Sequence, residues 1–299
     1  MKYDVIILGA GPAGLTAGLY AARSGLKTGI ISKDIGGTAN YILLLENWPG
    51  FKGTGEELMK QFYEQMKEYD AEFIMGEVES VEKKGKEFLI NMKKKQLETR
   101  AIIIATGTER RKLGIKGERE LTGKGVSYCA TCDGFFFRNK IVGVVGGSDC
   151  AATSALALAD LAKHVYIYYR GQKLRCEDVN SERLKNRKNV SIIYNAVPKE
   201  ILGSKKVEGI KMEIEGKEQE FKLDGVFVEI GAVPIIDITK KVGLKVDKEN
   251  YIIINEYMNT SVPGIFAAGD VTNHRLKQVV VASSQGAIAA KSAYEFLLK

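Results

Sequence analysis

The fold is decided by the stretch Gly9-Ala10-Gly11-Pro12-Ala13-Gly14, which follows a short apolar run and opens a segment rich in alanine. The apolar run Lys2–Leu8 predicts a strand, Leu15–Ser24 has the pattern of a helix, and Leu26–Ile31 predicts a second strand. A Gly-x-Gly-x-x-Gly motif between a strand and a helix is typical of a dinucleotide-binding βαβ unit. The start of the chain therefore predicts a nucleotide-binding domain.

Each glycine of this motif has its own physical role. Gly9 permits the tight turn, Gly11 lets the backbone approach a pyrophosphate, and Gly14 lets the helix pack close to the strand. The helix N-terminus supplies N–H donors and a positive dipole to the phosphates. An acid that would hold a ribose is expected at the end of the second strand, but Ser32 stands there and Asp34 comes two residues later. The motif therefore predicts phosphate binding more clearly than ribose binding.

The same order of elements recurs farther along the chain. Lys140–Val145 predicts a strand, Gly146-Gly147-Ser148 a turn, Cys150–Ala162 a helix, and His164–Tyr168 another strand. Two such units fit a chain of 299 residues, since one domain takes roughly 150 residues. The sequence therefore predicts two nucleotide-binding units.

The second unit differs from the first in the residues that would meet a nucleotide. Ser148 replaces the middle glycine of the motif, and its side chain crowds the approach of a phosphate. The second strand ends without an acid for a ribose hydroxyl, and Arg170, Lys173 and Arg175 follow instead. Because a cationic cluster suits a 2′-phosphate, this pattern favours NADPH over NADH. Three solvated basic residues on a loop are the alternative interpretation.

Further short strands are predicted between and after the two units. They are Glu77–Glu82, Glu87–Met92, Arg100–Ala105, Ser191–Tyr194, Val207–Ile214 and Gly225–Ile230. The stretch Gly264–Asp270 precedes a predicted helix, Ala282–Leu298. Repeated βαβ patterns of this kind predict an α/β protein.

The four cysteines divide into one close pair and two isolated residues. Cys129 and Cys132 form a Cys-x-x-Cys motif, which can close a small disulfide ring and open it by thiol exchange. Asp133 follows directly and is a candidate proton donor or acceptor for that chemistry, or a turn residue. A zinc site would need two more ligands, and the isolated Cys150 and Cys176 supply no second Cys-x-x-Cys. The sequence therefore predicts redox chemistry and no metal site.

Composition limits the class of protein. Hydrophobic residues make up 45% and charged residues 27% of the chain, as in globular proteins with a sizeable core. No stretch approaches roughly 18 apolar residues, and the N-terminus lacks a signal-peptide pattern, so we expect a cytoplasmic protein without membrane contact. The net charge is +7. The basic runs Lys93-Lys94-Lys95 and Arg110-Arg111-Lys112 are expected to be solvated turns rather than a nucleic-acid site.

Together these motifs resemble those of the low-molecular-weight thioredoxin reductases, which are FAD-containing pyridine nucleotide–disulfide oxidoreductases, over nearly the whole chain. Cys129-Ala130-Thr131-Cys132-Asp133-Gly134 is similar to the redox motif of that family and is the most specific match. The other matches are the pyrophosphate motif Gly9–Gly14, the turn Gly36-Gly37, the stretch Glu46–Gly50 that passes the flavin, the segment Ala105–Gly107 and the C-terminal motif Gly264–Asp270. By this resemblance, Asp270 would hold the ribityl chain of FAD.

The resemblance implies an α/β architecture of two Rossmann-like, three-layer ββα nucleotide-binding domains. An NAD(P)H-binding domain, residues 113–239, carries the disulfide and is inserted into an FAD-binding domain that is split into residues 1–112 and 240–299. Family members are homodimers that bind one FAD per subunit without a covalent link. A hinge motion, with hinges near Arg110–Gly114 and Ile235–Lys240, would bring the nicotinamide and the disulfide to the flavin in turn.

The resemblance also assigns contact residues to each cofactor. For FAD they are Gly9, Gly11, Pro12, Ala13, Gly14, Ser32, Gly36, Gly37, Thr38, Asn47, Val78, Ala105, Thr106, Gly107, Gly269, Asp270, Lys277, Gln278 and Val279. For NADPH they are Gly146, Gly147, Ser148, Asp149, Arg170, Arg175, Ile230 and Gly231. The implied reaction passes a hydride from NADPH to FAD and electrons from the flavin to the Cys129–Cys132 disulfide. By analogy Cys129 then attacks the disulfide of thioredoxin or a glutaredoxin-like protein, Cys132 faces the flavin, and Asp133 is the acid/base.

The chain departs from the family pattern mainly in its nucleotide half. Thr153-Ser154 stands for an acidic pair, and Tyr169-Arg170-Gly171 for the His-Arg-Arg of the family, so one of two adjacent arginines is lost. Lys277 replaces the usual arginine and Thr38 the usual glutamine. NADPH is still the favoured donor because the other arginines are kept, and the alternatives are NADH, reduced ferredoxin or a deazaflavin. Rival functions are a dithiol oxidase and a flavoprotein electron carrier or binding protein with a regulatory disulfide.

Overall fold

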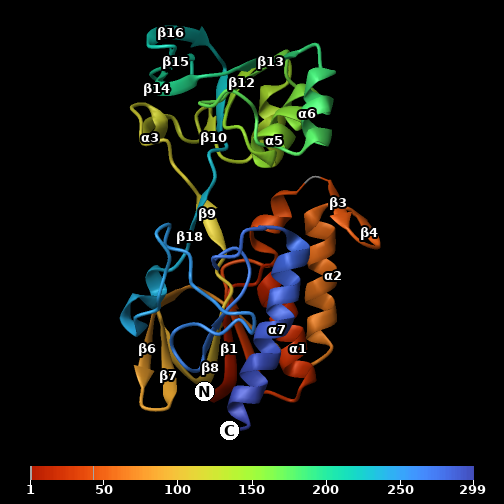
Figure 1. Ribbon diagram of the computed structural model, residues 1–299, viewed down its shortest axis with the longest axis vertical. Helices are drawn as coiled ribbons and strands as arrows, with labels where there is room; N and C mark the ends of the chain where they lie inside the picture. Colours follow the sequence, from red (N-terminus) through yellow and green to blue (C-terminus); the bar gives the residue numbers. More distant parts are fainter. Residues whose placement is uncertain (1, 43) are drawn as a thin grey trace. The chain divides into compact units, whose positions relative to one another are not determined.

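The chain crosses twice between two units, each with its own hydrophobic core. The computed structural model describes residues 2–42 and 44–299, apart from the side chain of Lys240. Unit 1 consists of Met1–Glu109 and Val233–Lys299, and unit 2 of Arg110–Ala232. The crossings lie in strands β9 (Thr108–Arg110) and β18 (Ala232–Pro234), which pair with each other (Figure 1).

Both crossings come earlier in the chain than the expected domain limits at 112 and 239. The expected hinge Ile235–Lys240 belongs to unit 1, where Thr106 Oγ1 donates a hydrogen bond of 2.7 Å to the carbonyl oxygen of Ile235. Strands β9 and β18 form hydrogen bonds with each other. Each unit therefore ends at this two-stranded sheet.

The sheet of unit 1 is built around β1 (Lys2–Leu8), which is buried on both faces. Val5 and Ile7 belong to the core on one face, and Tyr3, Ile6 and Leu8 to the core on the other. Such two-sided burial is typical of a central strand in a parallel sheet. The strand order is β5-β2-β1-β8-β7-β6, and β19 also pairs with β8. The other strands are β2 (Thr28–Ser32), β5 (Glu72–Met75), β6 (Val78–Lys84), β7 (Glu87–Met92), β8 (Lys95–Ile104) and β19 (Ile265–Ala267).

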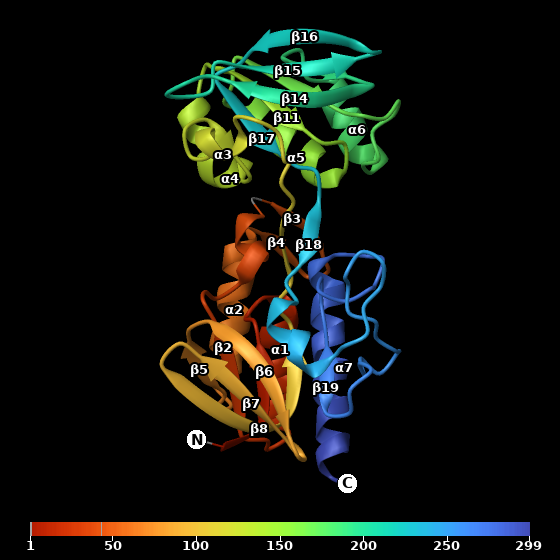
Figure 2. The ribbon, with the colours of Figure 1, turned by 90° about the vertical axis from the view of Figure 1, so that its left-hand side faces the viewer.

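Strand β8 connects the two chain segments of unit 1. Its last residues pair in parallel with β1 on one side and with β19 on the other, where Ile265 lies opposite Ile102. Its first residues pair antiparallel with β7, so β8 begins at Lys95 rather than at the predicted Arg100. Lys93 and Lys94 form the exposed turn of this hairpin, as expected for the first basic run (Figure 2).

Three helices cover one face of this sheet, α1 (Pro12–Arg23), α2 (Gly55–Lys67) and α7 (Val279–Leu297) (Figure 1). Helix α1 begins at Pro12 rather than at the predicted Leu15, because proline is pre-organised for the first turn. Helices α1 and α7 pack closely because Gly286 of α7 has no side chain. A Cβ atom at Gly286 would lie 2.1 Å from the carbonyl oxygen of Ala13. The remaining short elements are β3 (Leu45–Trp48), β4 (Phe51–Gly53), η1 (Gly37–Tyr41) and η3 (Asp237–Val242).

Unit 2 has the predicted three layers. Its central sheet is parallel, in the order β10-β17-β11-β12-β13. Helices α5 (Asp149–Ala159) and α6 (Asp178–Lys185) cover one face, and the antiparallel sheet β14-β15-β16 covers the other (Figures 1 and 2). The strands are β10 (Val126–Ser127), β11 (Ile141–Val145), β12 (His164–Tyr168), β13 (Val190–Ile193), β14 (Ala196–Leu202), β15 (Gly209–Ile214), β16 (Lys217–Lys222) and β17 (Gly225–Val228), with short helices α3 (Glu118–Leu121), α4 (Ala130–Asp133) and η2 (Gly134–Phe137).

The prediction of an α/β protein with two Rossmann-like folds, one inserted into the other, is confirmed. No helix among the described residues is long and apolar enough to cross a bilayer.

Candidate active site

A cavity of about 410 Å³ opens in unit 1 where strands β1, β2, β5, β8 and β19 end. Its size lies in the range of small-molecule sites, roughly 300–1,000 Å³, and its place at the carboxyl ends of parallel strands is where α/β sheets bind ligands. Most of the residues that the sequence assigned to FAD line it, namely Gly9, Gly11, Pro12, Ala13, Ser32, Gly37, Thr38, Val78, Ala105, Thr106, Gly107, Gly269, Asp270, Lys277, Gln278 and Val279.

Three residues assigned to FAD lie outside this lining. A Cβ atom at Gly14 would lie 1.9 Å from the carbonyl oxygen of Gly9, so Gly14 packs helix α1 against the turn. Gly36 precedes η1 with a φ of +97°. The amide of Asn47 donates a hydrogen bond of 3.0 Å to the side chain of Gln278, which does line the cavity. These three residues support residues of the lining without forming part of it.

Asp34, two residues after Ser32, also lines the cavity. Its Oδ1 accepts a hydrogen bond of 3.1 Å from the backbone N–H of Gly37 and so fixes the Gly36-Gly37 turn. The sequence did not single out Lys33 and Glu77, which form an ion pair of 2.6 Å at the mouth of the cavity. Their position directly after the β2 strand and beside β6 was the available signal.

Asp270 and Lys277 place opposite charges in the cavity lining. The Lys277 ammonium donates to the carbonyl oxygens of Asp270, at 2.9 Å, and of Thr272. Burial raises the pKa of Asp270, and the nearby Lys277 opposes that rise. Among the described residues, the Asp270 carboxylate accepts no hydrogen bond, so it is available to hydroxyl groups of a ligand. Beside it, the buried amide nitrogen of Gln285 also lacks a hydrogen-bond partner.

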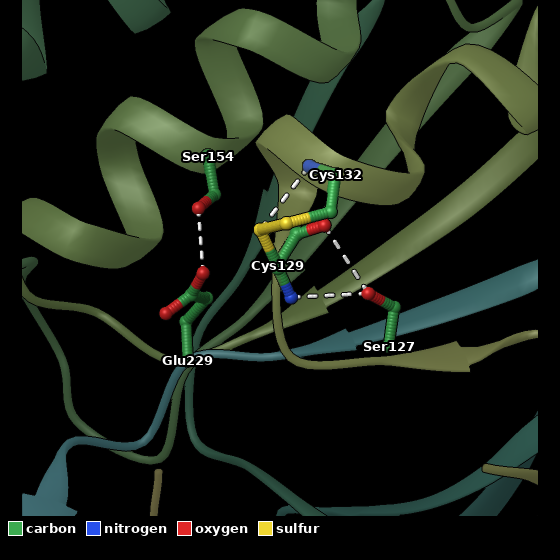
Figure 3. The surroundings of a disulfide bond; sticks show 5 residues. All are labelled: Ser127, Cys129, Cys132, Ser154 and Glu229. Atoms are coloured by element: carbon green, nitrogen blue, oxygen red, sulfur yellow. Dashed lines mark hydrogen bonds between the residues drawn. A yellow bond between two sulfur atoms is a disulfide. The ribbon is translucent and has the colours of Figure 1, made fainter. Parts of the chain in front are cut away.

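Cys129 and Cys132 of unit 2 form a disulfide with a Cα–Cα distance of 5.4 Å. Cys129 is the N-cap of α4, and its Sγ accepts a hydrogen bond of 3.1 Å from the N–H of Cys132. The Ser127 hydroxyl accepts from the N–H of Cys129 at 3.0 Å and donates to its carbonyl oxygen at 3.2 Å (Figure 3). Cys132 is exposed and Cys129 partly buried. Hydrogen bonds at its N–H, carbonyl and sulfur atoms therefore hold Cys129 in place.

The residues on either side of the disulfide differ in their environment. The carboxylate of Asp133 is partly exposed and accepts no hydrogen bond from a described residue. Tyr128 donates from its hydroxyl to Glu118 Oε1 at 2.8 Å. Burial and then this bond raise the pKa of Tyr128 to about 12. Lys112 Nζ lies 3.4 Å from the centroid of the Tyr128 ring, and this lysine of the second basic run is thus exposed, as expected, and also makes a cation–π contact.

Glu229 is the main residue that the sequence did not reveal. It lies 2% exposed directly after β17. Ser154 Oγ donates to its Oε1 at 2.7 Å, and Arg110 Nη1 to its Oε2 at 2.8 Å. Burial raises its pKa, with Arg110 and Ser154 opposing the rise. Figure 3 draws Glu229 and Ser154 in the surroundings of the disulfide.

The buried pair corrects the expectation that Arg110 belongs to a solvated turn. A single acid in the apolar run Gly225–Ile230 was the available signal, since a buried carboxylate needs a partner. Partial burial raises the pKa of the isolated Cys176 thiol, as expected for a residue without a redox role, and the isolated Cys150 is exposed on α5.

The Gly146-Gly147 turn of unit 2 packs against the backbone of Glu229. Gly146 has a φ of +152°, and a Cβ atom there would lie 2.2 Å from the carbonyl oxygen of Glu229. Ser148 is the N-cap of α5. Asp149 Oδ1 accepts hydrogen bonds from the N–H of Glu177 at 2.8 Å and from Asn180 at 3.0 Å. Asp149 therefore holds the start of α6 in place, in addition to the nucleotide contact that the resemblance assigns to it.

The basic residues after β12 stand beside this turn. Arg170 and Arg175 are exposed, and the N–H of Arg175 donates to the carbonyl oxygen of Gly147 at 2.7 Å. The carbonyl of Gly231 accepts from the N–H of Arg111 at 3.0 Å, and Ile230 is partly buried.

Tyr169 explains the loss of an arginine at Gly171. A Cβ atom at Gly171 would lie 2.7 Å from the Tyr169 ring, and one at Gly147 would lie 2.3 Å from it. The ring therefore fills the space between two glycines, and a side chain at position 171 would collide with it. Among the described residues, no three His, Cys, Asp or Glu side chains are placed to hold a metal ion.

A Cys-x-x-Cys disulfide on one Rossmann-like fold and a ligand cavity on another define a disulfide oxidoreductase of the nucleotide-dependent class. The model of the pyridine nucleotide-disulphide oxidoreductase family matches residues 3–286, and the chain belongs to this family.

Several proteins similar to this chain are thioredoxin reductases. It is 42% identical to a thioredoxin reductase of Listeria monocytogenes over 99% of this chain and 94% of that protein. The crystal structure of Lactococcus lactis thioredoxin reductase matches with a TM-score of 0.97 and 38% identity, covering 99% of both chains. The thioredoxin reductase of T. acidophilum matches with a TM-score of 0.95 and 38% identity, covering 100% of this chain and 99% of that one.

Proposed function

We propose that the protein is a thioredoxin-disulfide reductase, which passes electrons from NADPH through non-covalently bound FAD and the Cys129–Cys132 disulfide to thioredoxin or a thioredoxin- or glutaredoxin-like protein. The observation that carries the proposal is the Cys129–Cys132 disulfide, in which Cys132 is exposed, in a chain whose other unit has a cavity lined by a dinucleotide-binding motif. NADH, reduced ferredoxin or a deazaflavin are the alternative donors.

The cavity of unit 1 fits FAD. The Gly9–Gly14 turn and the N-terminus of α1 suit a pyrophosphate, and the Asp270 carboxylate suits the ribityl hydroxyls. In unit 2, the Gly146-Gly147 turn, the N-terminus of α5 and the exposed Arg170 and Arg175 suit a dinucleotide with a 2′-phosphate.

Held by the Gly9–Gly14 turn and Asp270, FAD would accept a hydride from NADPH and would supply two electrons to the disulfide. Reduction breaks the Cys129–Cys132 bond and leaves one thiolate and one thiol. The N–H of Cys132, which points at Cys129 Sγ, stabilises the thiolate on Cys129. Cys129 is therefore the attacking residue and Cys132 the resolving one.

The thiolate attacks the disulfide of the protein substrate. A mixed disulfide forms, and the leaving sulfur of the substrate takes a proton from Asp133. The Cys132 thiol then returns a proton to Asp133 and attacks the mixed disulfide, which re-forms the Cys129–Cys132 bond. The released substrate sulfur takes a proton from solvent, which completes the dithiol. The balance is one NADPH and one proton consumed for each disulfide reduced.

An exposed aromatic pair supports a protein as the final acceptor. Phe135 and Phe136, in η2 directly after the disulfide, are 67% and 69% exposed. Exposed aromatic side chains of this kind are typical of protein-binding surfaces.

The donor is tested by anaerobic titration of the purified yellow protein with NADPH and, separately, with NADH. We expect NADPH at micromolar concentration to bleach the flavin absorbance. Bleaching by reduced ferredoxin, with none by either nucleotide, would replace the donor in this proposal. A colourless protein would refute the flavin.

Serine variants of the pair test the relay. In Cys129→Ser and Cys132→Ser we expect NADPH to reduce the flavin normally while thioredoxin reduction falls to background, because no dithiol can form. Cys176→Ser is the matched control and should turn over thioredoxin like the parent. Thioredoxin turnover by either variant of the pair would show that electrons reach it another way.

Dimerisation and a cytoplasmic location are part of the same proposal. Sedimentation of the purified protein tests the first, with twice the 32.9 kDa chain mass as the expected result, and cell fractionation tests the second.

A further inference from the structure

The ammonium group of Lys277 forms its hydrogen bonds within the protein. The sequence assigns this residue to flavin contact, yet its ammonium group donates to the carbonyl oxygens of Asp270 and Thr272. Nζ also stands 4.2 Å from the centroid of the Tyr251 ring. Two carbonyl groups and an aromatic face surround the charge, which is the environment of a lysine that holds neighbouring chain in place.

The chain that Lys277 holds is the turn Gly269–Thr272. Gly269 has a φ of +80°, and its carbonyl accepts from the Thr272 hydroxyl at 2.8 Å. Thr272 is 0% exposed, so its carbonyl needs a donor inside the protein. Lys277 supplies that donor and, through the Asp270 carbonyl, a second hold on the residue that faces the cavity.

The same ammonium group is the countercharge of Asp270. Lys277 is the charged group that acts on the Asp270 carboxylate, and Lys277 itself faces Asp270 and Asp247. Burial raises the pKa of Asp270 and lowers that of Lys277, and the opposite charge of each group opposes the shift of the other.

We propose that Lys277 is a positioning residue of the FAD site, which fixes the Gly269–Thr272 turn through two backbone carbonyl groups and supplies the positive charge next to Asp270. This inference rests on the proposed binding of FAD. It assigns to Lys277 two separable tasks, hydrogen bonding to the turn and charge compensation of Asp270. An arginine performs both, glutamine performs part of the first, and methionine performs neither.

The experiment measures FAD affinity by flavin fluorescence after stripping and reconstitution, between about pH 4 and pH 9. The variants are Lys277→Arg, Lys277→Gln, Lys277→Met and the double variant Asp270→Asn with Lys277→Gln. Thermal unfolding of each stripped protein is recorded in parallel.

We expect the parent and Lys277→Arg to bind FAD with nearly the same affinity across this range. In Lys277→Gln and Lys277→Met the affinity at the acid end should fall on the order of tenfold or more, because a charge-assisted hydrogen bond is lost. It should recover as the pH rises and Asp270 ionises again. The double variant should bind weakly with no pH dependence.

A pH profile of Lys277→Gln parallel to that of the parent would overturn the charge role. Equal affinity of Lys277→Arg and Lys277→Met would overturn both roles. If Lys277→Met does not accumulate as folded protein, Lys277→Gln and the double variant give the same comparison. The readout is independent of turnover: a parent protein that binds no FAD refutes the proposed function, whereas pH-independent binding by every variant refutes this inference alone.

Discussion

Glu229 brings a carboxylate into the core of unit 2, and Arg110 and Ser154 compensate for its burial. Its side chain is 1% exposed and that of Arg110 is 31% exposed. Arg110 ends β9, on which the chain enters the unit, and Glu229 lies between β17 and β18, shortly before the chain leaves it. Since an unpaired buried charge costs more than a paired one gains, the pair fixes how these segments meet more than it adds stability.

Replacing Arg110 by methionine should therefore destabilise the protein. We expect a loss of about 1–3 kcal/mol in the free energy of unfolding, below the range for fully buried pairs because Arg110 is partly exposed. The double variant Arg110→Met with Glu229→Gln should recover most of it, because no charge is left in the core. Urea unfolding of the parent and both variants measures this, and a double variant weaker than the single one would contradict it.

The same variants should differ in their dependence on pH. The folded state raises the pKa of Glu229, so protonated Glu229 favours folding. Its contribution is full below the ordinary glutamate pKa of 4.5 and is lost as the pH rises through the higher folded value. Without Arg110 this loss grows. The stability of Arg110→Met should fall more steeply above about pH 5 than that of the double variant.

At the scale of elements, the β1–turn–α1 unit separates two uses of glycine. A Cβ atom at Gly14 would collide with the Gly9 carbonyl at 1.9 Å, whereas one at Gly11 would lie 3.8 Å from its nearest neighbour, the carbonyl oxygen of Gly36. Gly11 has a φ of −77°, which alanine also adopts. The protein itself therefore does not require glycine at position 11, and the proposed pyrophosphate does.

Gly11→Ala should fold like the parent and lose FAD affinity, since the added methyl group occupies the approach of the phosphates. Gly14→Ala should fail earlier, with a lower thermal midpoint before any cofactor is added. Thermal unfolding of the stripped proteins and FAD titration separate the two effects. Unchanged FAD affinity in Gly11→Ala would place the pyrophosphate elsewhere.

The element η2 makes a prediction about the protein substrate. Replacing Phe135 and Phe136 together by alanine should raise the KM for thioredoxin at least about tenfold, as for central aromatic residues of an interface, with little change in flavin reduction by NADPH. Tyr257, which is 58% exposed in unit 1, gives the matched control Tyr257→Ala. An unchanged KM would remove η2 from the docking surface.

Most elements followed from local pattern because their signals are short-ranged. The Gly9–Gly14 and Gly146–Ser148 turns, the period of the strands and the Cys129–Cys132 spacing all act within a few residues of chain. What the sequence missed depends on distant partners. Arg110 looked solvated because its partner Glu229 lies far along the chain, and β8 looked shorter because β7 supplies the pairing of its first half.

At the scale of the whole molecule, no hydrophobic cluster of the described residues spans both units. The two clusters of unit 1 draw on both of its chain segments, and the two clusters of unit 2 lie within residues 113–230. Each unit therefore has the means to fold by itself. The pairing of β9 with β18 brings the ends of unit 2 together, so excision leaves no long loop to close.

The segment Arg110–Ala232, produced alone, should fold cooperatively and keep a disulfide that dithiothreitol reduces, yet be colourless and inactive toward thioredoxin. Circular dichroism and urea unfolding measure its stability, and the intact protein should unfold in two transitions, one of them matching the fragment. The fragment with Arg110→Met also tests whether unit 2 folds by itself, because the Arg110–Glu229 pair lies wholly within the segment. A disordered fragment would show that unit 2 depends on unit 1 for its fold, and that the insertion is a dependent part of one folding unit.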